Sequence, residues 1–153
     1  MKSLLKNIKT RLTSKLEWMK PDCIFITPDA EYIPASVRPP CIGIKDGDIR
    51  RTPEPGTGTF RRESREVHII IWSDLIREET AIIGDSVLGE KGLAEAAEEV
   101  DAALDGYLAD ETVGDAWCKL EKGTEQFSDG HNIIQRKILT FEYETNGARP
   151  GER

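Results

Sequence analysis

One short segment constrains the fold of this chain more than any other. In the segment Val67–Trp72, every residue except His68 is apolar. Val67, Ile69 and Ile71 alternate with His68, Ile70 and Trp72. Successive side chains of a β-strand point to opposite faces of the sheet, so this segment presents apolar groups to both faces. Such a pattern is typical of a strand that has neighbours on both sides. It therefore predicts a strand at the centre of its sheet.

Four further segments are predicted as strands. Cys23–Thr27 and Cys41–Ile44 are β-prone runs bounded by proline, within a stretch that holds seven of the eight prolines. Near the end of the chain, Ala116–Gln126 and Ile133–Tyr143 flank the sequence Ser-Asp-Gly-His at 128–131. Asp-Gly between two β-prone runs is a strong signal for a hairpin, so we expect these last two strands to pair.

Two amphipathic helices are predicted, one before the first strand and one after the third. Residues 2–19 place six apolar side chains within an arc of about 120°: Leu4, Leu5, Ile8, Leu12, Leu16 and Met19. Pro21 is expected to end this helix. The second helix runs from Leu93 to about Leu108 and has a stripe of small and apolar residues. Such a stripe allows close packing on a sheet.

The order of elements is therefore αβββαββ, which predicts an α+β fold with two helices on one face of a mainly antiparallel sheet of four to five strands. We expect a single domain over residues 1–145 and a frayed tail over 146–153, where no apolar residue follows Ala148. No apolar run approaches the roughly 20 residues that span a bilayer, and the start of the chain lacks the apolar core of a secretion signal.

Between the second and third strands the sequence predicts a long, flexible hairpin arm over residues 46–63. From Arg50 to Thr59 it is rich in proline, glycine and threonine, which indicates irregular structure. Basic residues bracket this stretch on both sides: Arg50, Arg51, Arg61 and Arg62. Because they combine positive charge with a mobile setting, they are the candidate interface residues, although ordinary solubilising charge remains an alternative.

The charge of the chain is unevenly distributed. The formal net charge is −7, which argues against a nucleic-acid footprint over the whole surface, because phosphate contacts need clustered Lys and Arg. Residues 1–20 are strongly basic, whereas residues 90–111 carry eight acids against Lys91. This asymmetry predicts complementary faces that meet within one molecule or between copies. The alternative is that the basic and the acidic helix faces are both exposed to solvent.

No pattern of catalytic, cofactor-binding or metal-binding residues is present in the sequence. The three cysteines form no Cys-x-x-Cys pair, and the two histidines have no ligand partner spaced beside them, so no metal site is expected. The glycine-rich segment 84–92 resembles a phosphate loop, but Glu90 separates Gly89 from Lys91 and Gly92 stands where the hydroxyl is required. We therefore expect no enzyme and no cofactor.

The order of elements and several local strings resemble those of phage tail terminators, also called tail-completion or minor tail proteins. The strings begin with the opening helix and the proline-rich approach to the second strand. In order they are Leu4-Leu5-Lys6-Asn7-Ile8, Pro39–Gly47, Arg65–Trp72, Gly92–Val100 and Arg136–Tyr143, which together span most of the chain. None of them is a signature motif on its own.

The resemblance implies a structural protein without catalytic residues. Such proteins form a hexameric ring that caps the tail tube, stops its polymerisation and provides the joint to the head connector. It implies as partners further copies of the chain, the tail tube protein and a connector or neck protein, with DNA passing through the channel without specific binding. It also implies a virion component assembled in the host cytoplasm, with no membrane partner.

Three hypotheses about assembly follow from the charges and the arm. The arm would reach a neighbouring subunit or the tube, and the acidic excess would line a channel past which DNA slides. The basic first helix and the acidic second helix could meet across a head-to-tail ring interface. Other functions remain open: another head–tail joining protein, a small nucleotide-binding enzyme, or a monomeric regulatory binding module.

Overall fold

A computed structural model describes residues 1–53, 60–73, 92–107, 116–128 and 133–148. Its elements, in chain order, are α1 (Lys2–Lys15), the short 3-10 helix η1 (Pro21–Cys23), β1 (Ile24–Ile26), β2 (Cys41–Pro53), β3 (Phe60–Ser73), α3 (Leu93–Leu104), β4 (Ala116–Glu121), β5 (Glu125–Ser128) and β6 (Ile133–Ala148). None of the helices in these ranges has the length and apolar character needed to cross a membrane.

The six strands form one sheet in the order β1-β2-β3-β6-β4, and β5 pairs with the first part of β6, Ile133–Arg136. All pairs are antiparallel except β1 with β2. The predicted α+β class is confirmed, and β3 is the central strand as its two apolar faces indicated. The sheet has one strand more than the upper bound expected, because the segment 116–126 divides into β4 and β5, which pair with different parts of β6.

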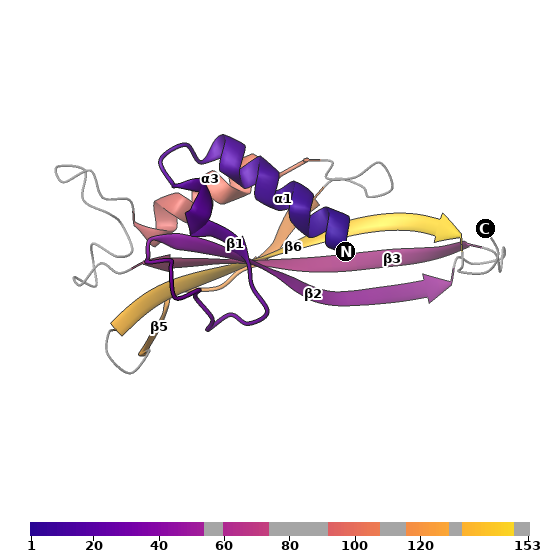
Figure 1. The fold of residues 1–153 in the computed structure, drawn as a ribbon. Helices are drawn as coiled ribbons and strands as arrows, with labels where there is room; N and C mark the ends of the chain where they lie inside the picture. The colour runs from indigo at the N-terminus through magenta and orange to yellow at the C-terminus, as the bar shows by residue number, and fades with distance from the viewer. Residues whose placement is uncertain (54–59, 74–91, 108–115, 129–132, 149–153) are drawn as a thin grey trace.

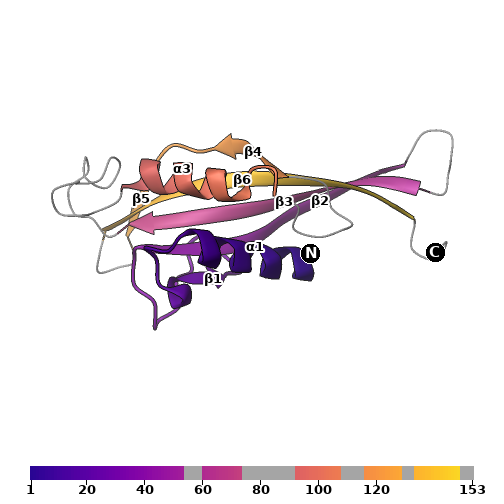
Figure 2. The same ribbon diagram turned by 90° about the horizontal axis from the view of Figure 1, so that it is seen from above.

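Both helices lie on one face of the sheet, as predicted (Figures 1 and 2). Leu4, Ile8 and Leu12 of α1 are buried there, and so are Leu93, Ala97, Val100 and Leu104 of α3. They pack on the alternate residues of the strands that point the same way, which are Ile42, Ile44, Val67, Ile69, Ile71, Leu139, Phe141 and Tyr143. This is the larger core, and we call its side of the sheet the helix-covered face.

The opposite face has a second core that is covered by a loop. Phe25 stacks on Trp72 with 5.7 Å between the ring centroids, and Ile70 and Ile134 join them. The segment between β1 and β2 packs against this cluster through partly buried apolar residues, Ala30, Ile33 and Val37. We call this side the loop-covered face. It accounts for the apolar residues on the second side of β3.

The two helices contact each other within one chain. Arg11 of α1 donates from Nε to the carbonyl oxygen of Ala103 at 3.0 Å, and its guanidinium lies 4.7 Å from the ring centroid of Tyr107. Trp18 donates from Nε1 to a carboxylate oxygen of Glu99 at 2.7 Å. The basic first helix and the acidic second helix therefore lie against each other within one chain, through a backbone carbonyl, an aromatic ring and an indole N–H.

Both helices are shorter than the sequence indicated. α1 ends at Lys15, ahead of Pro21, because Leu16 leaves the helical region; Leu16 and Met19 are nevertheless buried in the same core. α3 ends at Leu104, after which Gly106 adopts a φ of +69°, the left-handed conformation that favours glycine after a helix.

Two expectations about irregular segments are wrong. Arg50–Pro53 is regular strand, since these residues pair with Arg61–Ser64 of β3; the residues between, 54–59, lie outside the described part. The tail was expected to fray from residue 146, but β6 continues to Ala148 because it pairs there with Phe60. Residues 149–153, the Asp129-Gly130 turn and most of the segment 84–92 also lie outside the described ranges.

Candidate assembly interface

The far end of the sheet forms a three-stranded arm, which we define as Ile49–Pro53 of β2, Phe60–Ser64 of β3 and Glu144–Ala148 of β6. The register is continuous between β3 and β6, from Ser73 opposite Gln135 to Phe60 opposite Ala148. Figures 1 and 2 show the arm projecting beyond both helices. It replaces the predicted flexible hairpin with a paired ribbon.

Among the described residues, both outer edges of the arm are open. β1 pairs with β2 only from Ile42 to Ile44, so the far half of β2 has one strand neighbour. β4 pairs with β6 no further than Tyr143, so the far end of β6 also has a single neighbour. An open edge presents unpaired backbone N–H and C=O groups, which is the requirement for adding a strand from another chain.

A β-bulge marks the base of the arm. Asp46 lies opposite Val67 but Ile49 lies opposite Arg65, so β2 has one extra residue there. A Cβ atom on Gly47 would lie 2.8 Å from the carbonyl oxygen of Glu66 and 2.9 Å from Nε2 of His68. Glycine is therefore needed for the close approach of the two strands at this bend.

The two edges of the arm differ in charge. On the β2 edge, Arg50 and Arg51 are exposed, and on the β6 edge Glu144 is exposed. Arg51 also pairs through Nε with Glu63 at 2.9 Å, and Arg65 donates to the second oxygen of Glu63 at 2.9 Å. Glu63 is only 6% exposed, and its buried charge is compensated by Arg51 of the arm and by Arg65 at the base of the arm.

The structure brings the four candidate arginines together in the arm. Arg50 and Arg51 lie opposite Ser64 and Glu63, while Arg61 and Arg62 lie opposite Pro53 and Thr52. All four thus occupy two neighbouring strands within a few residues of each other. Whether they form an interface stays a prediction.

Sequence reasoning missed a polar cluster on the loop-covered face beside the arm. Glu66 and Glu142 are direct neighbours on β3 and β6, and Lys119 of β4 reaches both, at 2.8 Å from Glu66 Oε1 and 3.8 Å from Glu142 Oε2. The hydrogen bond from Lys119 holds the pKa of Glu66 below its usual value despite its partial burial. Lys119 reaches over because it is the extra residue of a second bulge, between Cys118 and Leu120.

The remaining titratable groups near the arm have structural surroundings. His68 has a lowered pKa because it is desolvated and lies near Lys45, and its Nδ1 is 3.0 Å from Oγ1 of Thr140. Burial, followed by the charges of Asp101 and Glu121, raises the pKa of the Cys118 thiol, which opposes formation of the reactive thiolate. Within the described ranges no group of His, Cys, Asp and Glu could hold a metal ion.

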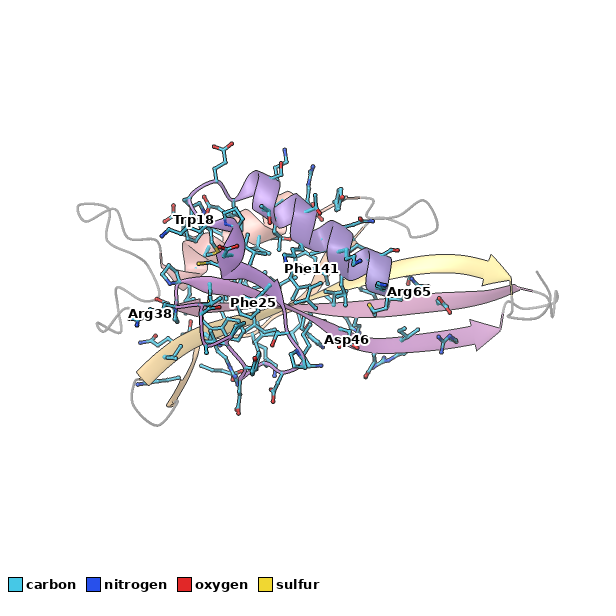
Figure 3. All side chains as sticks on the ribbon, viewed as in Figure 1. Trp18, Phe25, Arg38, Asp46, Arg65 and Phe141 are labelled. Atoms are coloured by element: carbon cyan, nitrogen blue, oxygen red, sulfur yellow. The ribbon has the colours of Figure 1, made fainter. Side chains whose placement is uncertain are left out.

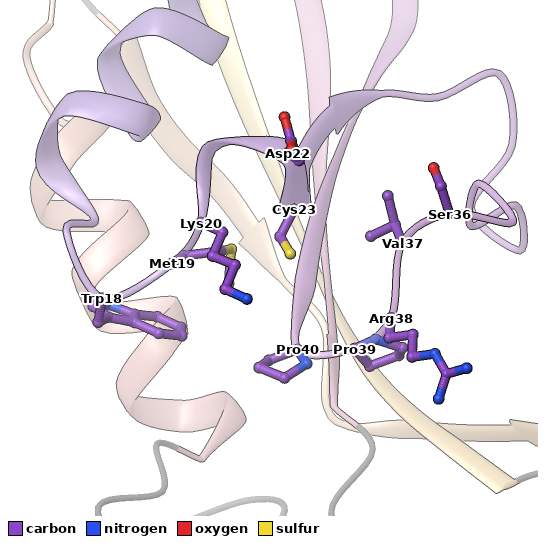
Figure 4. Close-up of a pocket in the computed structure, with 10 residues that line it drawn as sticks. All are labelled: Trp18, Met19, Lys20, Asp22, Cys23, Ser36, Val37, Arg38, Pro39 and Pro40. Carbon is purple, nitrogen blue, oxygen red and sulfur yellow. The ribbon is translucent and has the colours of Figure 1, made fainter.

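A separate groove lies between the end of α1 and the residues that precede β2. It has a volume of about 530 Å³ and is lined by Trp18, Met19, Lys20, Asp22, Cys23, Ser36, Val37, Arg38, Pro39 and Pro40 (Figure 4). Lys20 and Arg38 are exposed at its border. Six of its ten lining residues are apolar, and the other four are Lys20, Asp22, Ser36 and Arg38, so its lining is mixed.

Comparison with known proteins finds a similar fold but no match in sequence. No protein-family model matches the chain, and no curated protein matches it in sequence. The fold matches a chain in a solved structure described as "Virion of native gene transfer agent (GTA) particle", with a TM-score of 0.55 over 92% of both chains and 13% sequence identity. At that identity the match shows a shared fold over nearly the whole chain.

Proposed function

We propose that this chain is a structural virion protein of the tail-terminator kind. It would form a hexameric ring that caps the tail tube, stops its polymerisation and joins the tail to the head connector. The family resemblance of the sequence strings supports this role. The fold shared with a chain from a gene transfer agent virion supports it too.

The observation that carries the proposal is the arm, whose two outer edges have no further strand neighbour among the residues that the structure describes. One edge carries Arg50 and Arg51, and the other carries Glu144. Unlike edges on opposite sides of a molecule favour head-to-tail contacts, which close into a ring when the rotation between copies permits. Strand pairing between the β2 edge of one copy and the β6 edge of the next would bring the opposite charges together.

The overall charge supports a passive role toward DNA. With a formal net charge of −7, a ring would repel phosphates and let DNA pass through its channel without specific binding. Its partners would be further copies, the tail tube protein and a connector or neck protein. The role requires no cofactor, membrane or catalytic step, and places the protein in the virion after assembly in the host cytoplasm.

The first test is the native mass over a concentration series, together with negative-stain images. A hexamer of 17.1 kDa chains has a mass of about 103 kDa, and we expect rings of that mass with a central hole. Because the proposed contacts are partly ionic, high salt should weaken the ring. A monomer at every concentration, which a regulatory binding module would give, contradicts the proposal.

A shortened arm tests the same proposal more directly. Residues 51–63 are removed, and Arg50 is joined to Ser64, its partner in the ladder, through an Asn-Gly turn. The two cores lie outside the removed residues, so we expect a cooperative unfolding transition, a circular dichroism spectrum with less strand signal, and loss of the ring. Rings that persist with the shortened arm would show that the arm does not hold the subunits together.

A further inference from the structure

The exposed large apolar residues of the described chain lie in two pairs on opposite sides of the sheet. On one side, Ile26 of β1 is 43% exposed, and Tyr32 is 51% exposed; Tyr32 lies in the loop between β1 and β2, and its carbonyl oxygen accepts a hydrogen bond from the hydroxyl of Thr27. On the other side, Trp117 and Leu120 of β4 are each 50% exposed. β1 and β4 are the two edge strands, and Figure 2 shows them on opposite sides of the molecule. Exposed aromatic and aliphatic groups at an edge are typical of an interaction surface.

Exposed lysine and arginine side chains lie on the β1 side, together with one exposed acid, Asp22, in the lining of the groove. Arg11 faces α3, and at 100° per residue Lys2 and Lys9 lie on the side of α1 that is turned away from α3. Both lysines are exposed and make no ion pair within the described residues. The groove between α1 and β2 belongs to this side as well, and exposed Lys20 and Arg38 border it (Figure 4). Figure 3 shows Arg38 at the end of the molecule away from the arm.

Free negative charge accompanies the β4 side. Glu99 and Ala103 face α1, which places Asp101 and Asp105 on the far side of α3, over β4. Partial burial raises the pKa of Asp101, and the nearby carboxylates of Asp105 and Glu121 raise it further. Mutual repulsion within this group would be relieved by a positively charged partner.

We infer that these two sides are the two halves of one interface between copies of this chain: the β4 edge of one copy, led by Trp117 and Leu120, docks into the groove and along the β1 edge of the next copy. The inference rests on the proposed ring and names the surfaces that build it. Trp117 and Leu120 meet the apolar part of the groove, Trp18, Met19, Val37, Pro39 and Pro40, and Asp101 and Asp105 face the lysines of α1. The contact is head-to-tail, because the β4 side of one copy contacts the β1 side of the next copy.

The test uses two variants of the full chain, each of which damages one side. Trp117→Ser with Leu120→Ser removes the apolar groups of the β4 side, and Ile26→Asp with Arg38→Asp places acids opposite the acidic side of the neighbour. Thr10→Asp is the control, because Thr10 is exposed on the outer surface of α1, away from both sides. Mass is measured by sedimentation from about 1 µM to about 1 mM, the range in which weak specific interfaces associate.

We expect the protein concentration at which half of the chains are associated to be roughly tenfold higher or more for each variant alone than for the wild type. The control should behave as the wild type. An equal mixture of the two variants keeps one intact pair of sides. It should therefore form dimers of two 17.1 kDa chains, about 34 kDa, and no rings. Dimers in the mixture also show that both variants are folded.

Three results would overturn the inference. If the wild type forms rings and both variants do too, the ring is built by other surfaces and only the inference fails. If one variant remains associated while the other does not, the interface joins like sides and is not head-to-tail. If the wild type is monomeric over the whole range, the proposed ring fails together with the inference.

Discussion

Gly43 of β2 offers a sharp test of how tightly the loop-covered core is packed. A Cβ atom at this position would lie 2.7 Å from Cη2 of Trp72 and 2.9 Å from Cγ2 of Thr27, closer than non-bonded carbon atoms approach. Neither neighbour can move away easily. The Trp72 ring is fully buried and stacked on Phe25, and the hydroxyl of Thr27 lies 3.0 Å from the carbonyl oxygen of Asp29.

The expected size of the effect follows from two opposing contributions. Overpacking in a core costs about 1–3 kcal/mol. Replacing glycine by alanine also restricts the unfolded chain, which stabilises the protein by about 0.4–1 kcal/mol. We therefore expect Gly43→Ala to lower the free energy of unfolding by about 1–2 kcal/mol. For a chain of 153 residues this corresponds to a fall in melting temperature of about 2–8 °C.

Gly123 provides the matched control. No atom lies within 4 Å of the position that its Cβ would take, so Gly123→Ala adds a methyl group in open space. Only the unfolded-state contribution remains, and we expect a gain of up to about 1 kcal/mol. The measurement compares the urea unfolding midpoints of both variants with that of the wild type, provided that the m-values, the slopes of the free energy of unfolding against urea concentration, are equal. A Gly43→Ala variant as stable as the wild type would refute the packing argument.

Two further predictions concern single hydrogen bonds to carboxylates. Lys119→Met should lower the free energy of unfolding by about 1–2 kcal/mol at pH 7, because it leaves Glu66 and Glu142 side by side without their cation. The folded-state pKa of Glu66 lies below the ordinary 4.5, so the stabilisation by its charge is present above pH 4.5 and is lost as the pH falls through the folded-state pKa. In urea titrations, the difference in free energy of unfolding between the wild type and Lys119→Met should therefore be smaller at pH 3 than at pH 7. An equal difference at both pH values would contradict this prediction. Trp18→Phe removes the bond to Glu99, and we expect a loss of about 1–2 kcal/mol in thermal or urea unfolding, with an unchanged midpoint as the contrary result.

The sequence predicted the parts of the fold that depend on periodic burial. Apolar residues on both faces of β3 predict its central place, and apolar residues that repeat with the helical period predict the two helices. The end of α1 was harder to predict. Leu16 and Met19 continue the apolar stripe of the helix, yet they are buried from a non-helical segment, so burial alone did not reveal where the helix stops.

The arm could not be predicted from local sequence. Arg50–Pro53 is polar and ends in proline, so its own residues favour irregular structure, but pairing with β3 makes it a strand. Tertiary pairing of this kind outweighs local preference. The same holds for Asn146–Ala148, which lack a strong strand signal and are held by the ladder with β3.

The candidate site was predicted in part. Four arginines were singled out from charge and placement, and the structure places them on neighbouring strands of the arm. Two ion-paired groups could not be predicted from the sequence. Glu63 is buried between Arg51 and Arg65, and its partner Arg51 is distant in the sequence. Lys119 links β4 to Glu66, which is also distant in the sequence, and its position depends on a bulge. The spacing of charges gave no signal for either pairing.

The unbroken ladder between β3 and β6 has a mechanical consequence. β3 has 14 residues and is therefore about 48 Å long, and its register with β6 does not change from the core to the end of the arm. A pull along the arm loads many backbone hydrogen bonds at once and in shear, so the load is carried into the core beneath the helices. The arm therefore behaves as a stiff lever whose direction is set by the core and not as a tether that swings about its base.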